Sequence, residues 1–205
     1  MIHLIGSGGH ARVVLDSLAA LGLPAQSIAV FDQNPDRIGG KIGSHTIQGF
    51  DAVQLSHSSV HICIGDNRAR ANVAAALEEV GCTLRTIVDP RAIVSASATI
   101  GAGTFVAAGA IVATGATTGR GCIINHGAIV DHECVLADFV HIAPGATLAG
   151  SVAIGQGTLV GAGANVLPGI SVASNAIVGA GAVVIDDAAD PSVYVGVPAR
   201  KVERR

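Results

Sequence analysis

A six-residue periodicity is the feature that most constrains this chain. Divided into sixes from Ala92, the sequence runs to Asp187 as sixteen consecutive blocks without an insertion. The third residue of each block is Ile, Val or Leu, except for Thr118, and the first is nearly always Ala, Thr, Cys or Val. This period fits neither an α-helix nor an ordinary strand, but it fits a β-helix in which three short strands form one triangular coil. We therefore predict a parallel β-helix with stacked aliphatic side chains inside and Gly at many turns.

The residues before the repeat show a different pattern, in which apolar runs alternate with helical segments. The expected strands are Ile2–Ile5, Ile28–Phe31, Val60–Ile64 and Leu84–Val88. A helix is expected after the first strand and another after the third. This alternation predicts a small parallel α/β unit that is half of a Rossmann-like fold. We expect two domains, with residues 1–90 forming the α/β domain and residues 91–205 forming the β-helix with a C-terminal tail.

Composition and charge exclude several classes of function. The 205-residue chain has a formal net charge of −3, so bulk nucleic-acid binding is not expected. Its basic residues cluster only near the end, at Arg200, Lys201, Arg204 and Arg205. No apolar run reaches the roughly 18 residues of a membrane span and no signal peptide is recognised, so we expect a cytoplasmic protein without membrane contact. The cysteines lack C-x-x-C spacing and are expected to be buried, reduced thiols. They are Cys63, Cys82, Cys122 and Cys134.

A glycine-rich loop follows the first expected strand. The string Gly6-x-Gly8-x-x-Ala11 opens the first helix, and Asp32 ends the second strand. This is the pattern of a dinucleotide site, in which a helix N-terminus holds phosphate and an acid binds ribose. The α/β part is too short for a full two-half dinucleotide fold, so the pattern favours a site for one nucleotide. Tight strand-to-helix turns explain the same glycines without a ligand.

Charged residues interrupt a run of Gly and Ala in the middle of the repeat. Asp131, His132 and Glu133 follow one another where the β-helix itself needs no charge. A histidine with a near-neutral pKa can take up a proton at working pH, and a carboxylate can fix its tautomer. His126 occupies the same fifth place of the preceding block, and His141 follows half a coil later. A solvent-facing histidine on a turn is the simpler alternative for each.

Three stretches together resemble the PglD/NeuD group of sugar acyltransferases, which are hexapeptide-repeat transferases. They are residues 5–12 (IGSGGHAR), 125–134 (NHGAIVDHEC) and 194–201 (YVGVPARK), and the resemblance covers essentially the whole chain. It implies a left-handed β-helix, acetyl-CoA as cosubstrate, no metal, and a homotrimer with its sites between subunits. No covalent enzyme intermediate is required, so neither Cys122 nor Cys134 is expected to act as a nucleophile.

The resemblance implies roles for individual residues. His132 matches the general base, Glu133 the carboxylate that orients it and raises its basicity, and His141 the residue beside the acetyl-CoA thioester. The positions that match the site for a UDP-sugar are Gly8, Gly9, His10, Asp32, Gln33 and Gly65. Gln33 stands where the family has a second acidic residue, which leaves the contacts to base and ribose open. Asn125 is expected to shape the same site, and His126 is either a surface residue or part of the sugar pocket.

Small residues on the later coils match the positions that line acetyl-CoA. They are Gly161, Ala162, Gly179 and Ala180. Their small size lets a pantetheine arm approach the main chain, although ordinary turn residues are the simpler alternative for any one of them. Arg200 and Lys201 are expected either near CoA phosphates or in solvent.

The resulting hypothesis is an acetyl-CoA-dependent N-acetyltransferase. It acts on the C4 amine of a UDP-linked 4-amino-4,6-dideoxy sugar of the bacillosamine type, for bacterial glycan synthesis, with His132 as general base. O-acetylation of sialic acid or another sugar is the nearest alternative. A γ-type carbonic anhydrase is an alternative of another class, because His126, His132 and His141 supply the three zinc ligands that it needs. A non-catalytic β-helix that binds a nucleotide is a further alternative.

Overall fold

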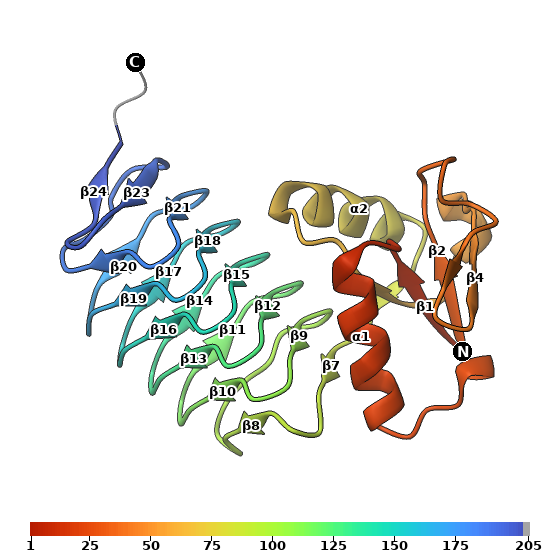
Figure 1. The fold of residues 1–205 in the computed structure, drawn as a ribbon, viewed down its shortest axis with the longest axis horizontal. Coiled ribbons are helices and arrows are strands. Elements are labelled where there is room, and N and C mark those ends of the chain that lie inside the picture. The colour runs from red at the N-terminus through yellow and green to blue at the C-terminus, as the bar shows by residue number, and fades with distance from the viewer. Residues whose placement is uncertain (203–205) are drawn as a thin grey trace.

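The structure is a computed structural model that describes residues 1–202. Arg204 and Arg205, half of the basic C-terminal cluster, lie outside the described residues. The chain forms an α/β unit at one end of a long triangular β-helix, and strands β23 (Val193–Val195) and β24 (Arg200–Lys201) lie at the other end (Figure 1). The fold expected from the sequence, a small α/β unit followed by a left-handed parallel β-helix, is confirmed.

The α/β unit contains one six-stranded sheet with the strand order β3-β4-β2-β1-β5-β6. Its strands are β1 (Ile2–Ile5), β2 (Ile28–Phe31), β3 (Lys41–Ile42), β4 (His45–Gln48), β5 (Ser59–Ile62) and β6 (Thr83–Leu84). Its helices are α1 (Gly9–Ala20) and α2 (Asn67–Glu79), with short 3-10 turns at Ala25–Ser27 and Ala52–Leu55. All strand pairs are parallel except the β3–β4 hairpin at one edge. Sequence reasoning missed this hairpin because its two strands are short and partly exposed.

The expected strand Leu84–Val88 is wrong as a single element. Leu84 ends β6, which pairs with β5 in the α/β sheet, whereas Ile87–Val88 form β7, which pairs with β9 of the β-helix. Asp89 fixes this crossing: its carboxylate accepts hydrogen bonds from Ser17 of α1 (2.6 Å) and from Arg91 (2.8 Å). The six-residue period therefore begins one block earlier than Ala92, and its first strand continues directly from the α/β unit.

The β-helix has three faces made of short parallel strands. The eight-stranded face contains β7 (Ile87–Val88), β9 (Phe105–Val106), β12 (Ile123–Ile124), β15 (His141–Ile142), β18 (Leu159–Val160), β21 (Ile177–Val178), β23 (Val193–Val195) and β24 (Arg200–Lys201). The six-stranded face contains β8 (Ile93–Val94), β10 (Ile111–Val112), β13 (Ile129–Val130), β16 (Thr147–Leu148), β19 (Asn165–Val166) and β22 (Val183–Val184). The four-stranded face contains β11 (Thr117–Thr118), β14 (Val135–Leu136), β17 (Ala153–Ile154) and β20 (Ser171–Val172).

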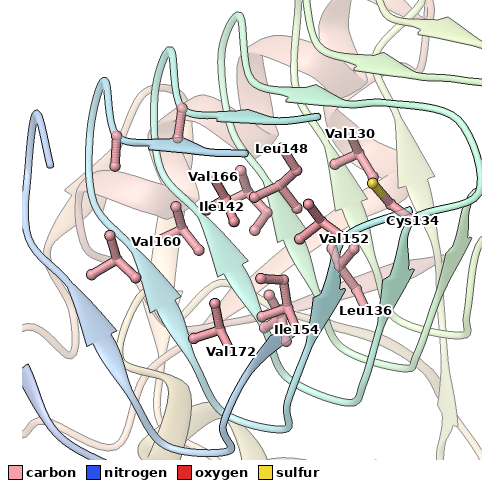
Figure 2. Close-up of a cluster of buried hydrophobic side chains, with 14 of the residues drawn as sticks. Val130, Cys134, Leu136, Ile142, Leu148, Val152, Ile154, Val160, Val166 and Val172 are labelled. Carbon is pink, nitrogen blue, oxygen red and sulfur yellow. The ribbon is translucent and has the colours of Figure 1, made fainter. Parts of the chain in front are cut away.

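The core of the β-helix follows the six-residue period. Third-position residues stack one coil apart, as Ile124 pairs with Ile142 and Val130 with Leu148, and their side chains fill the prism (Figure 2). Thr118, the one polar third residue, is 6% exposed, and its hydroxyl accepts a hydrogen bond from the Gly101 N–H (3.1 Å). The expected burial pattern is thus confirmed, and its exception has a hydrogen-bond partner.

Three corners join the faces, and stacked backbone hydrogen bonds run along each. The His126 corner joins the eight-stranded to the six-stranded face and stacks Ala108, His126, Pro144, Ala162 and Ala180. The His132 corner joins the six-stranded to the four-stranded face and stacks Thr114, His132, Gly150 and Pro168. The Arg120 corner joins the four-stranded to the eight-stranded face and stacks Arg120, Asp138 and Gln156. Successive blocks of the sequence therefore lie on different corners.

Candidate active site

A pocket of about 440 Å³ lies at the carboxyl ends of β1, β2 and β5. Ligands of open parallel sheets bind at this edge, where the chain order reverses between neighbouring strands. The pocket brings together all six residues expected to hold the nucleotide sugar. They are Gly8, Gly9, His10, Asp32, Gln33 and Gly65. These residues follow β1, β2 and β5 or begin α1, so the sheet topology brings them together although they are far apart in sequence.

The N-terminus of α1 opens into this pocket. Gly8 is the N-cap and makes no side-chain capping hydrogen bond, and a Cβ added at Gly9 would meet open space. The first N–H groups of the helix are therefore accessible to an anion. A second hollow beside the loop is lined by Arg12, Arg37 and Lys41. The sequence reasoning missed these cations because the loop before β3 and the β3–β4 hairpin that carry two of them were not expected.

Asp32 is held at the pocket by several partners. Its carboxylate accepts hydrogen bonds from the backbone N–H of Ser7 (2.8 Å) and from that of Asn34 (2.9 Å), and Arg37 lies 3.5 Å away. Burial alone would raise the pKa of Asp32, but the hydrogen bonds from Ser7 and Asn34 and the charge of Arg37 outweigh burial and lower it. Asp32 therefore stays ionised and ties the glycine loop to β2.

A cluster of imidazoles lies where the α/β unit meets the eight-stranded face. His10 packs edge-on against Phe105 at 5.3 Å, and the His141 Nε2 atom lies 3.2 Å from the Asn125 side-chain nitrogen. Burial lowers the pKa of His141 to about 4, with a further contribution from the charge of Arg70. Burial also lowers the pKa of His10 to about 3. Both imidazoles are therefore neutral at pH 7.

The His132 corner carries the charged turn. The Nδ1 atom of His132 lies 3.5 Å from the Glu133 Oε2 atom, and the Ser151 hydroxyl donates to the same oxygen at 3.3 Å. The ring of His132 lies over Gly150 on the next coil, where a Cβ would overlap it. Both side chains remain open to solvent, with 57% of the His132 side chain and 72% of the Glu133 side chain exposed. A carboxylate beside one ring nitrogen of an exposed histidine is the arrangement in which a carboxylate can orient a general base.

Glu133 has an unfavourable backbone conformation. Its φ of 58° lies in the left-handed region, at the sixth position of a block where the repeat usually places Gly. Phe139, Ser151 and Asn175 are the other non-glycine residues of the repeat with this conformation. A left-handed conformation costs an ordinary residue about 1 kcal/mol or more. A strained residue that is also charged and exposed is typical of a functional position.

Comparisons with known proteins show the family to which the chain belongs. The family model of the PglD N-terminal domain matches residues 1–77. A His-to-Asn variant of perosamine N-acetyltransferase from Caulobacter crescentus, solved with CoA and GDP-perosamine, is 34% identical, with 99% of this chain and 97% of that chain covered and a TM-score of 0.92. The chain belongs to the PglD-type sugar acetyltransferases. It is therefore an enzyme of the acyltransferase class, as expected from the sequence.

Two further structures resemble this PglD-type chain over nearly its whole length. The acetyltransferase domain of PglB from Neisseria gonorrhoeae, solved with acetyl coenzyme A, is 35% identical, covers 98% of each chain and has a TM-score of 0.90. WeeI from Acinetobacter baumannii has a TM-score of 0.90 over 98% of this chain and 99% of its own, and at 23% identity it supports the fold alone. No curated protein sequence matches the chain.

Within one chain, this PglD-type fold does not bring all the expected site residues together. The nucleotide-sugar residues, His141 and Asn125 lie beside the eight-stranded face, whereas His132 and Glu133 lie on the His132 corner with a separate shallow hollow. His126 lies on its own corner, so the three histidines of the zinc hypothesis do not converge within the chain. Among residues 1–202, no three His, Cys, Asp or Glu side chains form a group that could hold a metal ion.

The small residues expected to line acetyl-CoA divide into two kinds. A Cβ at Gly161 would clash with backbone atoms of Val178 and Ala180, and one at Gly179 would clash with Val195. Coil stacking alone therefore requires these two glycines. Ala162 and Ala180, by contrast, are exposed and stack in the same column as His126.

The C-terminal residues close the far end of the β-helix. The Nζ atom of Lys201 lies 2.7 Å from Asp190, and the Nη1 atom of Arg200 lies 3.9 Å from Asp186. Both expected CoA contacts are thus close to acidic groups in this chain. In the part of the chain that the structure covers, helices are too short and too polar to cross a membrane.

Proposed function

We propose that this enzyme transfers the acetyl group of acetyl-CoA to the C4 amine of a UDP-linked 4-amino-4,6-dideoxy sugar, with His132 as general base. The observation that carries the proposal is the His132–Glu133 pair, held at 3.5 Å on a strained turn that the β-helix itself does not require. Relatives that are 34% and 35% identical over nearly the whole chain were solved with CoA and GDP-perosamine and with acetyl coenzyme A.

The pocket of the α/β unit supports a nucleotide-linked substrate. An uncapped helix N-terminus and the nearby cations Arg12, Arg37 and Lys41 complement a diphosphate. Asp32 and Gln33 lie at the end of β2, on the side where the nucleoside would lie. The Gln33 amide offers both a donor and an acceptor to the edge of a uracil ring. A relative that binds a GDP-sugar makes the base the first variable to test.

The His126 corner supports a path for acetyl-CoA along the β-helix. Ala162 and Ala180 expose only methyl groups there, and the backbone of the column stays accessible to a pantetheine arm. His141 lies on the adjoining face beside Asn125, where it would contact the thioester. Its neutral imidazole can hydrogen-bond without adding charge to the site.

The proposed transfer is a direct attack. The sugar nitrogen forms a bond to the thioester carbonyl carbon, His132 Nε2 takes the proton that the nitrogen loses, and the C–S bond then breaks to release CoA, whose sulfur receives that proton. Glu133 fixes the proton on Nδ1 and stabilises the imidazolium that forms. Cys122 and Cys134 take no part: both are buried, and burial raises the pKa of each thiol.

A homotrimer explains why the site is divided within one chain. The pocket lies in the α/β unit and His132 lies in a separate hollow on a corner of the prism, so a complete site needs the His132 corner of one subunit against the pocket of the next. A cyclic trimer makes three such contacts with the same pair of surfaces. We place the active site at this junction.

Release of free CoA thiol from acetyl-CoA tests the proposal. A panel of UDP-, GDP- and dTDP-linked 4-amino sugars is compared for the wild type and His132→Ala. We expect turnover on a UDP-linked 4-amino sugar and a loss of roughly 10²- to 10⁴-fold in the variant. Turnover on a GDP-linked sugar alone would overturn the choice of nucleotide but not the reaction. No turnover on any amine, or equal turnover in the variant, would overturn the mechanism.

A further inference from the structure

Arg70 of α2 is a buried cation without a carboxylate partner. Its side chain is 1% exposed, and its five N–H groups donate to five neutral oxygen atoms. The acceptors are the carbonyls of Ile64, Gly65, Gly121 and Phe139 and the side-chain oxygen of Asn67, at 2.7–3.0 Å. Every donor of the guanidinium is therefore satisfied, and none of these partners neutralises its charge.

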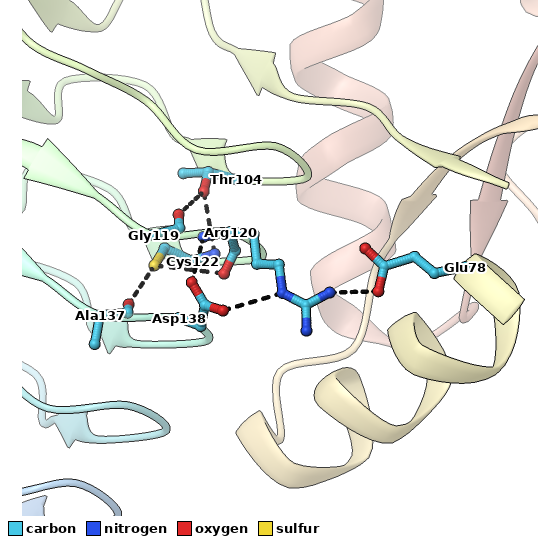
Figure 3. A network of polar contacts seen from close by, with 7 residues as sticks. All are labelled: Glu78, Thr104, Gly119, Arg120, Cys122, Ala137 and Asp138. Carbon is cyan, nitrogen blue, oxygen red and sulfur yellow. Dashed lines mark hydrogen bonds and ion pairs between the residues drawn. The ribbon is translucent and has the colours of Figure 1, made fainter. Parts of the chain in front are cut away.

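Arg120 provides the contrast within the same interface. It also ties α2 to the β-helix, but its guanidinium pairs with the carboxylates of Glu78 and Asp138 (Figure 3). Its charge is thus compensated, and it is partly exposed. Two arginines thus link α2 to the β-helix: the charge of Arg120 is balanced by carboxylates, and that of Arg70 is not. A buried charge without a counter-ion is costly and is retained where it does something else.

The hydrogen bonds of Arg70 fix the position of the Gly65 loop. Two donors hold Ile64 and Gly65 in the pocket wall, and two others hold Gly121 and Phe139 on the Arg120 corner. The planar fork thereby sets how the β5–α2 loop meets the β-helix. The Gly65 backbone in turn acts on the ring of His141, where it raises the pKa of the imidazole against the larger effect of burial. One side chain therefore links the nucleotide pocket to the face that carries His141.

The charge of Arg70 acts on the neighbouring imidazoles. It disfavours protonation of His10, His61 and His141, in addition to the larger effect of burial. His61 and His141 act on His10 more strongly than Arg70 does, and His126 acts on it less strongly. The Asp66 carboxylate and the Cys122 thiol act on Arg70 itself. A neutral His141 keeps Nε2 as an acceptor for the Asn125 amide at 3.2 Å, which a protonated ring would lose.

We infer that Arg70 is a positioning residue of the transfer site, which fixes the Gly65 loop against the β-helix and places a positive charge beside the imidazoles of His10 and His141. The inference rests on the proposed function for its catalytic consequence. The two effects of Arg70, on the position of the loop and on the charge near the imidazoles, do not depend on turnover. They can be separated because Arg70→Lys keeps the charge and Arg70→Gln removes it.

An NMR titration of the full-length protein with labelled histidine rings tests the charge. In the wild type, His141 is expected to titrate with a pKa of about 4. Arg70→Gln removes the charge and keeps two of the five side-chain N–H donors, and we expect the pKa of His141 to rise by roughly 1 unit. Arg120→Gln is the matched control, because it breaks a link between the same two parts without removing an uncompensated charge, and it should leave this pKa unchanged.

Arg70→Lys tests position with the charge retained. The pKa of His141 should stay low, while fewer donors hold the loop, so KM for the nucleotide sugar should rise roughly tenfold with an unchanged pH profile of kcat.

The role of the charge would be overturned if the pKa of His141 did not change in folded Arg70→Gln, or if it changed equally in Arg120→Gln. If Arg70→Gln does not fold, an elevated His141 pKa in Arg70→Lys would overturn that role. Wild-type KM in Arg70→Lys would overturn the positioning role. Because the titration needs no turnover, failure of the proposed acetyl transfer alone would leave its result intact.

Discussion

The His126 corner and the His132 corner share one backbone geometry but differ in what they carry. The His126 corner has Gly at each left-handed position from 109 to 181 and small residues around its single histidine. The His132 corner replaces Gly with Glu133 and Ser151 and places an imidazole over Gly150. Stacking requires the first and third residues of each block and favours Gly at the sixth. Departures from Gly occur on the His132 corner and, at Phe139 and Asn175, on the Arg120 corner, whereas the His126 corner keeps Gly and small residues. Among these departures Glu133 carries a charge, and for that reason we assign a function to the His132 corner.

Mixing two inactive variants tests most directly whether the pocket and the His132 corner of different subunits form one site, and we expect the largest effect there. Gly9→Asp places a carboxylate in open space at the phosphate end of the pocket, so it should block the substrate without disturbing the fold. Neither Gly9→Asp nor His132→Ala should turn over alone. Co-refolded in equal amounts, they should recover about a quarter of wild-type activity, because each site then draws its two halves from different subunits of a cyclic trimer.

The double variant Gly9→Asp/His132→Ala mixed with wild type is the control, since it places both lesions on one subunit. Sedimentation of each mixture reports the oligomeric state. Complete sites within one chain would show no recovery in the mixture of single variants, and that result would remove the need for a trimer at the active site.

Substitution of Glu133 separates backbone strain from chemistry. Glu133→Gly should raise the free energy of unfolding by up to about 1 kcal/mol, because Gly adopts a φ of 58° without strain. It should also lower kcat about tenfold or more, because the carboxylate that orients His132 is lost. Urea unfolding and CoA release measure the two effects.

Two matched variants complete this test. Glu133→Gln keeps the strain and loses the charge, so it should lower kcat without a gain in stability. Asn175→Gly changes a residue with the same φ of 58° on the Arg120 corner, and because Asn tolerates this conformation better than Glu, it should gain less stability than Glu133→Gly and lose no activity. Full activity of Glu133→Gly would contradict a role for its carboxylate.

Gly150→Ala tests the position of the His132 ring. The new methyl group would overlap the imidazole, which must rotate away from Glu133, while the backbone at Gly150 lies outside the left-handed region. We expect kcat to fall several-fold with little loss of stability, since an exposed ring can move. In a His132→Ala background the same change should have no further effect on stability. A wild-type kcat for Gly150→Ala would show that the observed ring position is not the reactive one.

Low pH is expected to destabilise the folded protein through the buried imidazoles on the pocket side. His10, His61 and His141 have pKa values lowered to about 3, about 4 and about 4, from 6.5, chiefly by burial. Between pH 6.5 and 4 the unfolded chain therefore binds more protons than the native state, so stability is complete above pH 6.5 and falls as the pH drops. Urea unfolding at pH 7 and pH 5 should differ by a few kcal/mol, and His61→Gln should reduce the slope by about one proton. Equal stability at both pH values would contradict the burial of these imidazoles.

The sequence was most informative where its period and its geometry coincide. The β-helix, its core positions and its Gly turns could all be predicted, because each coil repeats the same local requirement. The glycine loop, Asp32 and Gly65 could be placed in one pocket because they end successive parallel strands. The His132–Glu133 pair was proposed as a catalytic pair because it breaks the period, and its position on a corner apart from the pocket could be seen only in the three-sided structure.

Other parts depend on contacts between distant segments. The strand at Leu84–Val88 was misplaced because its two halves pair with different sheets, and a local apolar pattern cannot distinguish them. Arg70 gave no signal, because a single arginine in a helix is usually solvated and only its five partners reveal its burial. Arg37 was missed for a similar reason, as it reaches the pocket from an irregular loop.

The stacked coils of the β-helix set fixed distances between residues on the same corner. His126 and Ala180 are separated by three coils of the same corner, which is about 14 Å at the usual spacing of neighbouring strands. An insertion of one coil between them would lengthen that span by a single step and leave every other column in register. The number of coils between two positions on one corner therefore sets the length of an extended ligand that can bind to both, and a change in that number leaves the residues at the two positions unchanged.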